Sequence, residues 1–501
     1  MTHTTPETHA DWQRLASQLH LETRAWIGQR HTAAQDGARL TTLNPATGEV
    51  LAEVVACDAP EADAAVRHAR RAFEAGHWSR RPPAERKRTL LRLADLMAHH
   101  RHELALLDTL DMGKPITSAL GDLDGAIGCI RYQAETIDKL YGEIAPTGEE
   151  HLGLVLREPL GVVAAIVPWN FPMMMTAWKI APALAAGNSV ILKPSEKSPL
   201  SALRLAALVA EAGVPDGVFQ VLPGYGHTVG QALALSMDVD CLAFTGSTQV
   251  GKQLMQCAGR SNLKKVYLEC GGKSPNVVFA DCRDLDAVAA HAASAIFHNQ
   301  GEVCIAGSRL LVDNRIRDAL VERVVAAAEH MQPGDPLDPA TAMGAMVDQA
   351  QYDRVMTYIR RGVEEGAHLC TGGQALDGPG LFIPPTIFND VNADMTIARE
   401  EIFGPVLSIM GFDSEDEAIA LANDSVYGLA AGLWSQDIDR IMRVTRRLRS
   451  GQVYVNNWAG SDMTMPFGGV KQSGNGRDKS YHSLEEYSEL KAVWMALNVK
   501  A

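Results

Sequence analysis

The chain has 501 residues, of which 46 % are hydrophobic and 21 % charged, and its 46 Lys and Arg against 60 Asp and Glu give a formal charge of −14 at pH 7. This length exceeds what one hydrophobic core normally serves, so we expect two or three domains. The acidic balance argues against a nucleic-acid or anionic-membrane partner.

The ends and the cysteines indicate the compartment. The N-terminal stretch MTHTTPETHADWQRL lacks the basic start and apolar core of a signal peptide. The longest apolar-looking runs, such as GVVAAIV, are too short to span a bilayer. The eight cysteines include no CxxC pair and no cysteine–histidine cluster with zinc spacing. We therefore expect a soluble, cytoplasmic protein with reduced thiols and no metal.

Helical patterns fill most of the stretch from residue 61 to about 140. They include EADAAVRHARRAFEAG and a longer stretch that begins at AERKRTLLRLADLM. Asp58 and Pro60 suit the start of the first helix, because proline is tolerated in the first helical turn.

From residue 161 onward, short β-rich runs alternate with Ala- and Leu-rich helical runs; the β-rich runs are GVVAAIV, NSVILK, GVFQVLP, CLAFTG and KVYLE. Apolar strands separated by roughly 10–15 residues of helix indicate βαβ units and a buried parallel sheet. Such a doubly wound sheet binds ligands at the carboxyl ends of its strands. The chemically interesting residues stand at those ends: Trp169 and Asn170, Lys193 to Glu196, Thr245 to Thr248, and Glu269.

The remainder of the chain predicts a second α/β unit, which begins near PNVVFADC (275–282) and runs to about residue 470. The C-terminal YSELKAVWMAL predicts one more strand, and LGLVLREPL near 152–160 predicts another. We expect these two strands to pair with each other outside both domains.

The reactive motifs are ambiguous when taken singly. Cys304, in FHNQGEVCIAGSR (297–309), is either a buried core cysteine or a nucleophile. FTGSTQVG (244–251) lacks the GxGxxG spacing, so it is either a phosphate-binding turn or a plain one. Lys193 and Glu196 suit a surface ion pair or a ribose site, and Glu269 suits a structural anion or a base.

Taken together, the motifs resemble those of the aldehyde dehydrogenase superfamily in order and spacing. The resemblance runs from about residue 20 to the end and rests on VPWNFP (167–172), KPSE (193–196), FTGST (244–248), LECGGKSPN (268–276), NQGEVCIAGSR (299–309), EEIFGPVL (400–407) and MPFGGVKQSGNGRDKS (465–480). It implies an α/β aldehyde dehydrogenase fold. The implied parts are a Rossmann-like doubly wound NAD-binding domain (20–140 and 161–270), an α/β catalytic domain (271–481), and a small β oligomerisation flap (141–160 and 482–501) that builds homodimers or homotetramers.

The resemblance also implies the catalytic groups. Cys304 is then the nucleophile, because thiolate attack on an aldehyde gives a thiohemiacetal from which hydride leaves readily. A free thiol has a pKa of roughly 8.5 and needs a base at neutral pH; Glu269 is that base, and it later activates the water that hydrolyses the thioester. The oxyanion is held by the side-chain amide of Asn170 and the backbone N–H of Cys304.

The cofactor implied by the resemblance is NAD. Glu196 corresponds to the carboxylate that binds the adenine-ribose hydroxyls and repels a 2′-phosphate, so NAD is favoured and NADP remains possible. Glu401 corresponds to the residue that holds the nicotinamide ribose. The full expected cofactor set is Val167, Pro168, Trp169, Lys193, Ser195, Glu196, Gly226, Phe244, Thr245, Gly246, Ser247, Val250, Leu268, Gly271, Glu401 and Phe403. Cys270 departs from the family's usual aliphatic residue, and we interpret it as a tolerated small apolar side chain.

The substrate implied by the resemblance is a small-molecule aldehyde. Stretches such as AETIDKLYGEIAPT, KPSEKSPLSA and LPGYGHTVGQALAL resemble the bacterial polyamine-catabolism branch, which oxidises γ-glutamyl-γ-aminobutyraldehyde, 4-guanidinobutyraldehyde and related ω-aminoaldehydes. Asp122 and Asp124 then either attract a cationic substituent at the tunnel mouth or form a solvated helix face. The other expected substrate contacts are Phe171, Met175, Trp178, Val303, Ile305, Trp458, Asp462 and Phe467.

Three rival interpretations remain. The nearest is a broad-specificity aliphatic or betaine aldehyde dehydrogenase. An acylating, coenzyme-A-dependent enzyme fits less well, because the deacylation base Glu269 is present. A catalytically idle binding or structural protein on this fold is opposed by the intact set of Cys304, Glu269 and Asn170.

Overall fold

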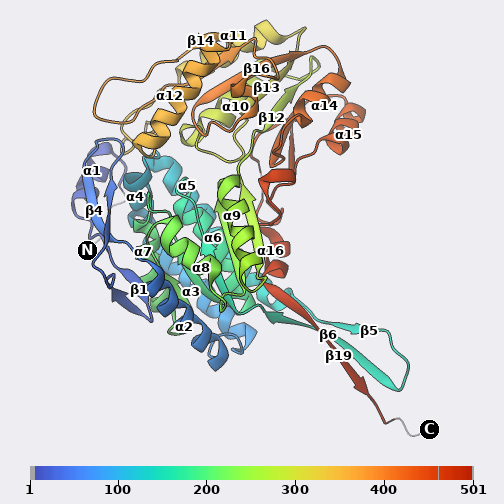
Figure 1. The fold of residues 1–501 in the computed structure, drawn as a ribbon. Coiled ribbons are helices and arrows are strands. Elements are labelled where there is room, and N and C mark those ends of the chain that lie inside the picture. The colour runs from blue at the N-terminus through green and yellow to red at the C-terminus, as the bar shows by residue number, and fades with distance from the viewer. Residues whose placement is uncertain (1–5, 461, 499–501) are drawn as a thin grey trace.

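The computed structural model describes residues 6–460 and 462–498. Figure 1 shows two α/β units stacked on each other and a β-flap that projects from the body. Within the described ranges, no helix is both long and apolar enough to cross a membrane.

The first sheet has the strand order β11–β10–β7–β8–β9–β1–β2. Its strands are β1 (Ala25–Ile27), β2 (Arg30–Thr32), β7 (Val162–Ile166), β8 (Ser189–Lys193), β9 (Phe219–Val221), β10 (Cys241–Gly246) and β11 (Lys265–Cys270). Strands β7 to β11 run parallel, whereas β1 is antiparallel to both neighbours. All residues of β7 and β8 are buried, which is why these strands read as near-continuous apolar runs.

Helices cover both faces of this sheet, as a doubly wound fold requires. One face packs against α2 (Ala59–Ala75), α8 (Gln231–Leu235) and α9 (Thr248–Arg260). The other packs against α3 (Pro83–His99), α4 (Arg101–Met112), α5 (Ile116–Thr136), α6 (Pro172–Ala186) and α7 (Leu200–Ala212), to which α1 (His9–Ser17) adds Trp12. Alternate residues of β7 face the two cores. Val162 and Ala164 pack on the side of α2, α8 and α9, whereas Val163 and Ala165 pack on the side of α3 to α7.

Local sequence signals set several of these boundaries. Asp58 caps α2, where it forms a capping box with Glu61, and Pro60 lies in the first turn, as predicted. The helical stretch predicted from residue 61 to about 140 is confirmed as α2 to α5 and the turn η1 (Ile137–Lys139). Strand β10 coincides with the predicted run CLAFTG, and β11 extends the predicted run KVYLE by one residue, Cys270. The N-terminal strands β1 and β2 and the hairpin of β3 (Arg39–Leu43) and β4 (Val50–Val55) were not predicted.

The second sheet has the order β14–β15–β16–β13–β12–β17–β18, and only β14 is antiparallel to its neighbour. Its strands are β12 (Pro275–Val278), β13 (Arg309–Asp313), β14 (His368–Thr371), β15 (Thr386–Asn389), β16 (Val406–Phe412), β17 (Ala430–Trp434) and β18 (Gln452–Val455). They lie within the range predicted for a second α/β unit. One face packs against α10 (Leu285–Phe297) and α11 (Arg317–Glu329), and the other against α12 (Gln349–Glu364), α13 (Thr396–Arg399), α14 (Glu415–Asn423) and α15 (Ile438–Arg447).

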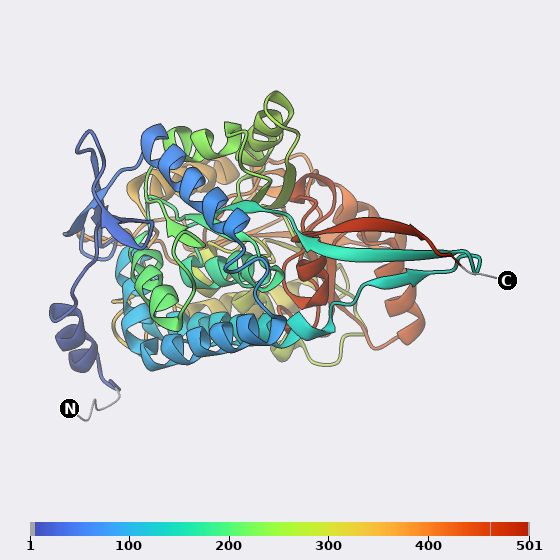
Figure 2. The same ribbon diagram turned by 90° about the horizontal axis from the view of Figure 1, so that it is seen from below.

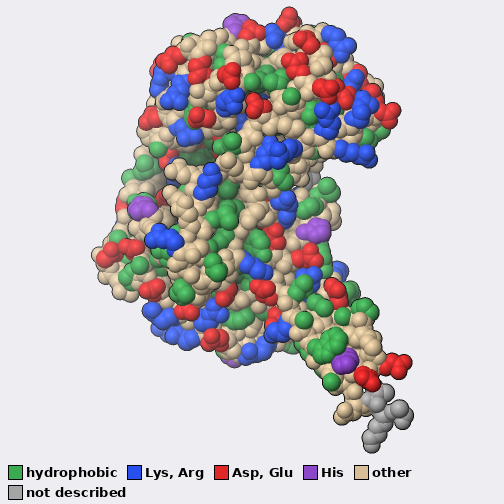
Figure 3. Space-filling model, turned by 45° about the vertical axis from the view of Figure 1, so that its right-hand side comes forward, with side chains coloured by type: hydrophobic (Ala, Val, Ile, Leu, Met, Phe, Trp, Pro, Cys, Tyr) green, Lys and Arg blue, Asp and Glu red, His purple; other side chains and the backbone are tan. Residues whose placement is uncertain are grey.

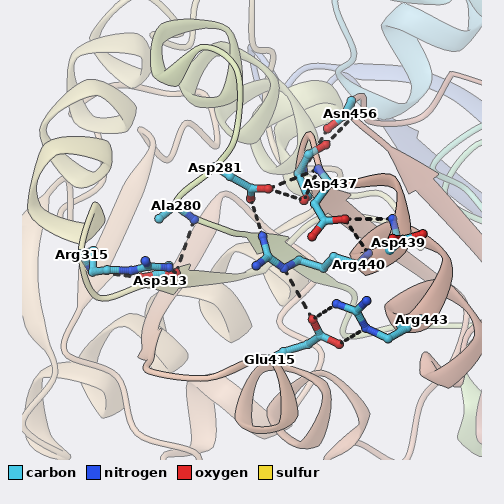
Figure 4. A network of polar contacts seen from close by, with 11 residues as sticks. Ala280, Asp281, Asp313, Arg315, Glu415, Asp437, Asp439, Arg440, Arg443 and Asn456 are labelled. Atoms are coloured by element: carbon cyan, nitrogen blue, oxygen red, sulfur yellow. Dashed lines mark hydrogen bonds and ion pairs between the residues drawn. The ribbon is translucent and has the colours of Figure 1, made fainter.

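A network of charges closes the carboxyl edge of the second sheet (Figure 4). Arg440 of α15 lies 2.8 Å from Asp281, which follows β12, and 3.5 Å from Glu415 of α14. Arg443 also pairs with Glu415, at 2.9 Å. Ligands of parallel sheets normally bind at this edge. Here the protein's own charges occupy it, and the amino edge of the second sheet faces the first sheet instead.

The flap consists of β5 (Glu143–Ala145), β6 (His151–Pro159) and β19 (Ser488–Ala496), in the order β19–β6–β5. The predicted pairing of the two strands is confirmed: Ser488 to Ala496 pair antiparallel with Pro159 to His151. Figures 1 and 2 show the flap extending away from both units. The turn η4 (Lys471–Ser473) and helix α16 (Ser480–Glu486) lead into it.

Candidate active site

A cavity of about 420 Å³ lies where the carboxyl ends of β7, β10 and β11 meet the loops that precede β13, β16 and β17. Twelve of the residues singled out from the sequence line it: Pro168, Trp169, Asn170, Phe171, Met175, Thr245, Gly246, Ser247, Gly271, Cys304, Glu401 and Phe403. The cavity therefore joins expected catalytic, cofactor and substrate residues from both sheets.

Cys304 follows a strained turn. Asn299, Gln300 and Gly301 have φ values of 50°, 57° and 72°, a left-handed conformation that side-chain-bearing residues rarely adopt. A Cβ at Gly301 would collide with the backbone of Gly404, so only glycine fits there. The turn is held by packing from the 401–405 loop, and it presents Cys304 to the cavity.

The Cys304 thiol is protonated in the resting chain. Burial raises its pKa to about 12, and the carboxylates of Glu401 and Glu269 act in the same direction. Because a thiolate is the reactive form, a cysteine in this environment needs a base in order to act as a nucleophile.

Glu269 is a buried carboxyl group in an environment that favours its protonated form. Only 2 % of the residue is exposed, and neither carboxylate oxygen has a hydrogen-bond partner. Burial raises its pKa well above the ordinary value, and the nearby carboxylate of Asp478 adds to the effect. Asp478 itself forms a buried ion pair with Lys179 at 2.6 Å. A carboxyl group with a raised pKa is matched to general base work near neutral pH.

Asn170 is fixed beside the thiol loop. Its side-chain Nδ2 donates to the carbonyl of Glu302 at 2.7 Å, and its own carbonyl accepts from Asn299 Nδ2 at 3.1 Å. The buried Asp108 of α4 caps the start of α6 through the N–H of Met173, at 3.2 Å. An amide nitrogen carries two hydrogens, so Asn170 retains one for an oxyanion.

The loop of residues 401–405 forms another wall of the cavity, which Glu401 and Phe403 line. The N–H of Gly272 donates to Glu401 Oε1 at 3.0 Å, and burial raises the pKa of Glu401 to about 7. Phe403, at φ 60°, packs edge-on against Trp169 with ring centroids 5.3 Å apart. On α12, Arg354 donates to the carbonyl of Glu401 at 2.9 Å.

One end of the cavity is formed by the start of α9. Ser247 caps this helix by accepting from the N–H of Val250 at 3.3 Å, and Gly246 to Gln249 line the cavity. Helix N-termini attract anions through their free N–H groups and dipole. At the end of β8, Lys193 lies 3.1 Å from Glu196, and burial lowers the pKa of Lys193.

The remaining expected residues do not line this cavity: Val167, Lys193, Ser195, Glu196, Gly226, Phe244, Val250, Leu268, Glu269, Asp122, Asp124, Trp178, Val303, Ile305, Trp458, Asp462 and Phe467. Glu269, Val303 and Ile305 flank lining residues, and the rings of Trp178 and Phe467 pack together at 4.9 Å. Trp458 faces the backbone of Gly307 and Gly432, where an added Cβ would lie 3.2 and 2.7 Å from its ring.

The two aspartates on α5 are already paired within the protein. Asp122 is buried against the ammonium of Lys114, which also lies 4.0 Å from the ring centroid of Phe171. Asp124 accepts from Arg101 at 2.6 and 2.7 Å. This geometry does not support an open pair of carboxylates at a tunnel mouth. Asp124 is exposed, as on a solvated helix face, whereas Asp122 is buried in an ion pair that neither interpretation of the sequence included.

Six lining residues were not among the expected site residues: Thr248, Gln249, Cys270, Gln351, Arg354 and Tyr427. Thr248 and Cys270 stand inside the recognised motifs, so the motif boundaries carried a signal for them. Gln351 and Arg354 come from α12, where no local pattern marks them; Gln351 donates to the carbonyl of Phe403 at 2.7 Å.

Comparison with known proteins identifies similar sequences and structures among the aldehyde dehydrogenases. The sequence pattern described as "Aldehyde dehydrogenase family" matches residues 31–493. The NADP/NAD-dependent aldehyde dehydrogenase PuuC of Escherichia coli is 53 % identical over 489 residues, which are 97 % of this chain and 98 % of that protein. The solved structure of γ-glutamyl-γ-aminobutyraldehyde dehydrogenase from Burkholderia cenocepacia has a TM-score of 0.96 at 54 % identity, covering 98 % of this chain and 100 % of that one. P. syringae indole-3-acetaldehyde dehydrogenase, in complex with NAD+ and IAA, has a TM-score of 0.97 at 55 % identity with the same coverage.

Proposed function

The chain belongs to the aldehyde dehydrogenase family, and from that premise we propose that it oxidises an aldehyde to its carboxylic acid with NAD as hydride acceptor and NADP as an alternative. The observation that carries the proposal is the convergence of Cys304 and Asn170 on one cavity. Glu269, a buried carboxyl without hydrogen-bond partners, lies in the strand next to it.

In the proposed reaction Glu269 takes the proton of Cys304, and the thiolate attacks the aldehyde carbon to give a thiohemiacetal. Asn170 Nδ2 and the N–H of Cys304 donate to the resulting oxyanion. When bound, the nicotinamide accepts the hydride. After it has released the first proton to solvent, Glu269 takes a proton from the water that attacks the Cys304 thioester; the C–S bond breaks, the Cys304 thiolate leaves and the acid is released.

The residues present fit a dinucleotide. The first turn of α9 suits a pyrophosphate, because Thr248 and Gln249, which begin this helix, line the cavity beside Gly246 and Ser247. A Cβ at Gly271 would collide with the carboxylate of Glu401, so glycine leaves room for that acid to reach a ribose. Glu196 provides a carboxylate for ribose hydroxyls and disfavours a 2′-phosphate. Residues 20–140 and 161–270 form the proposed NAD-binding domain, and 271–481 the catalytic domain.

For the substrate class, we propose the ω-amino, guanidino and γ-glutamylamino aldehydes of polyamine breakdown. The stretches that resemble the polyamine-catabolism branch, and the similarity to PuuC and to γ-glutamyl-γ-aminobutyraldehyde dehydrogenase, support this class. The similarity to indole-3-acetaldehyde dehydrogenase favours a second candidate, an arylacetaldehyde. Phe171 and Met175 give the cavity an apolar wall that is compatible with either tail.

A substrate panel separates these candidates. We expect NADH formation with a kcat/KM preference of about tenfold or more for γ-glutamyl-γ-aminobutyraldehyde, 4-guanidinobutyraldehyde and 4-aminobutyraldehyde over betaine aldehyde, butanal and indole-3-acetaldehyde. Asp124→Asn is the matched variant: because Arg101 already pairs with Asp124, the preference should change less than about twofold. A panel led by indole-3-acetaldehyde or butanal would overturn the substrate class and leave the catalytic proposal intact.

For assembly, we propose a homodimer or homotetramer built through the flap, residues 141–160 and 482–501, of which 499–501 lie outside the described residues. Its apolar side chains face outward: Tyr141 and Ile144 are each 75 % exposed, Trp494 66 % and Leu490 60 %. Figure 3 shows hydrophobic side chains gathered on the projecting arm. Large exposed apolar surfaces of this kind mark interaction sites. The eight free cysteines support a reducing, cytoplasmic setting.

Introducing charge on the flap should separate the subunits. Leu490 and Trp494 share one side of β19, because they are four residues apart in a strand. We expect the Leu490→Lys/Trp494→Lys variant to elute as a monomer in light-scattering chromatography. Met237→Lys, at an exposed methionine outside the flap, should keep the wild-type mass. Equal masses for all three proteins would rule out the flap as the interface.

A further inference from the structure

Two side chains of the thiol loop, residues 299–304, form hydrogen bonds with one distant segment, residues 344–347. Gln300 accepts from the N–H of Gly344 at 3.0 Å and donates to the carbonyl of Ala345 at 3.1 Å. Glu302 accepts from the N–H of Val347 at 3.1 Å. The segment is itself anchored, because the N–H of Ala345 donates to Gly113 and that of Met346 to Leu381. The strained turn before Cys304 is thus fastened at two points to a fixed strip of backbone.

The backbone of Glu302 connects these hydrogen bonds to Asn170, the proposed oxyanion donor. Its carbonyl accepts from Asn170 Nδ2 at 2.7 Å and from Asn299 Nδ2 at 3.2 Å. Cys304 follows two residues later. A shift of Glu302 therefore displaces the nucleophile and the amide that stabilises the oxyanion at the same time.

The Glu302 side chain is in an environment that does not suit a charge. The residue has no exposed surface, and its second carboxyl oxygen has no hydrogen-bond partner. Within the described part of the chain, no ion pair includes Glu302; Lys197 and Lys114, whose charges act on Glu302, are paired with Asp348 and Asp122. A buried carboxylate without a partner is strongly unfavourable. Burial accordingly raises the pKa of Glu302 well above its ordinary value.

We propose that Glu302 is a positioning residue: as an uncharged carboxylic acid it fastens the thiol loop to residues 344–347 and thereby sets the distance between the Cys304 thiol and the Asn170 amide. This inference rests on the proposed function, because the distance matters only if both groups act on one aldehyde. Glu302 itself does not line the cavity.

The test compares Glu302→Gln, which keeps the shape and an acceptor oxygen without a charge, with Glu302→Leu, which keeps the size and removes the acceptor. We expect Gln to retain kcat within about threefold and Leu to lower it by up to about 100-fold with little change in KM, since a misplacement near 1 Å has an effect of that size. The rate of Cys304 labelling by iodoacetamide should change with Leu and not with Gln. If Leu fails to fold, Glu302→Asp, too short to reach Val347, replaces it.

Glu61→Leu is the matched control, because Glu61 is a buried carboxyl that caps α2 far from the cavity. It should lower the melting temperature and leave kcat per folded molecule unchanged. An equal loss of kcat in Glu302→Gln and Glu302→Leu would contradict the proposal that Glu302 acts as an uncharged acid. A wild-type kcat and a wild-type labelling rate in Glu302→Leu would contradict the positioning role. Labelling needs no aldehyde, so it decides this inference even if no aldehyde is oxidised and the proposed function fails.

Discussion

Cys304→Ala is expected to lower kcat for aldehyde oxidation by about 10⁶-fold, the scale seen when a catalytic nucleophile is removed. The methyl group cannot form the thiohemiacetal, so no tetrahedral, electron-rich carbon is available to lose hydride. Binding of NAD should persist, because Cys304 contributes no side-chain contact needed by the first turn of α9. NADH formation by absorbance and NAD binding by calorimetry measure the two properties separately.

Cys282→Ala is the matched control, because Cys282 is also a free, partly exposed thiol but belongs to the core beside α10. It should retain the wild-type rate. Iodoacetamide labelling adds a second readout: one cysteine should react in an aldehyde- and NAD-sensitive manner, and that reaction should disappear with Cys304→Ala. Activity surviving in the alanine variant would refute the assigned nucleophile and direct attention to Cys270, the other thiol that lines the cavity.

The sequence allowed prediction of those site residues whose position follows from a strand end. Asn170 follows β7 and lines the cavity, and Glu269, the last residue but one of β11, precedes the lining residue Cys270. The parallel strand β10 pairs with both β7 and β11, so the carboxyl ends of all three strands lie at the same edge of the sheet. The pairing of β6 with β19 was also readable, because both are apolar runs at the two margins of the domains. In each case a local pattern and a general rule of sheet geometry are sufficient.

Residues whose role depends on a partner far along the chain were not predictable. Arg354 reaches the 401–403 loop only because α12 packs beside it, and no periodicity reveals that contact. Asp122 reads as a free acid on a helix, but the buried ammonium of Lys114 neutralises it. Glu302 stands inside a recognised motif, yet its bond to Val347 spans 45 residues. Tertiary contacts of this kind decide whether a carboxyl group is a ligand, a base or an anchor.

Glu269→Gln is expected to lower the steady-state rate by about 10²- to 10⁴-fold, the usual contribution of a general base. Glutamine has nearly the same shape, and both oxygens of Glu269 lack hydrogen-bond partners, so the fold should be preserved. A rapid burst of NADH equal to the enzyme concentration would place the loss in thioester hydrolysis. Absence of a burst, together with slower iodoacetamide labelling of Cys304, would place it in thiol activation. An unchanged steady-state rate would contradict both roles.

The pH dependence gives an independent check on the same residue. Burial and the carboxylate of Asp478 raise the pKa of Glu269, so the ionised base is scarce at low pH and its fraction grows as the pH rises through the raised value. The wild-type kcat should therefore increase with pH from mildly acidic conditions. This limb should vanish in Glu269→Gln, which has no carboxyl group to ionise, and persist in Glu61→Gln, a matched change at a buried carboxyl remote from the cavity. If the limb survives in Glu269→Gln, another group controls it, and the buried Glu401, whose pKa is raised to about 7, is the next to test.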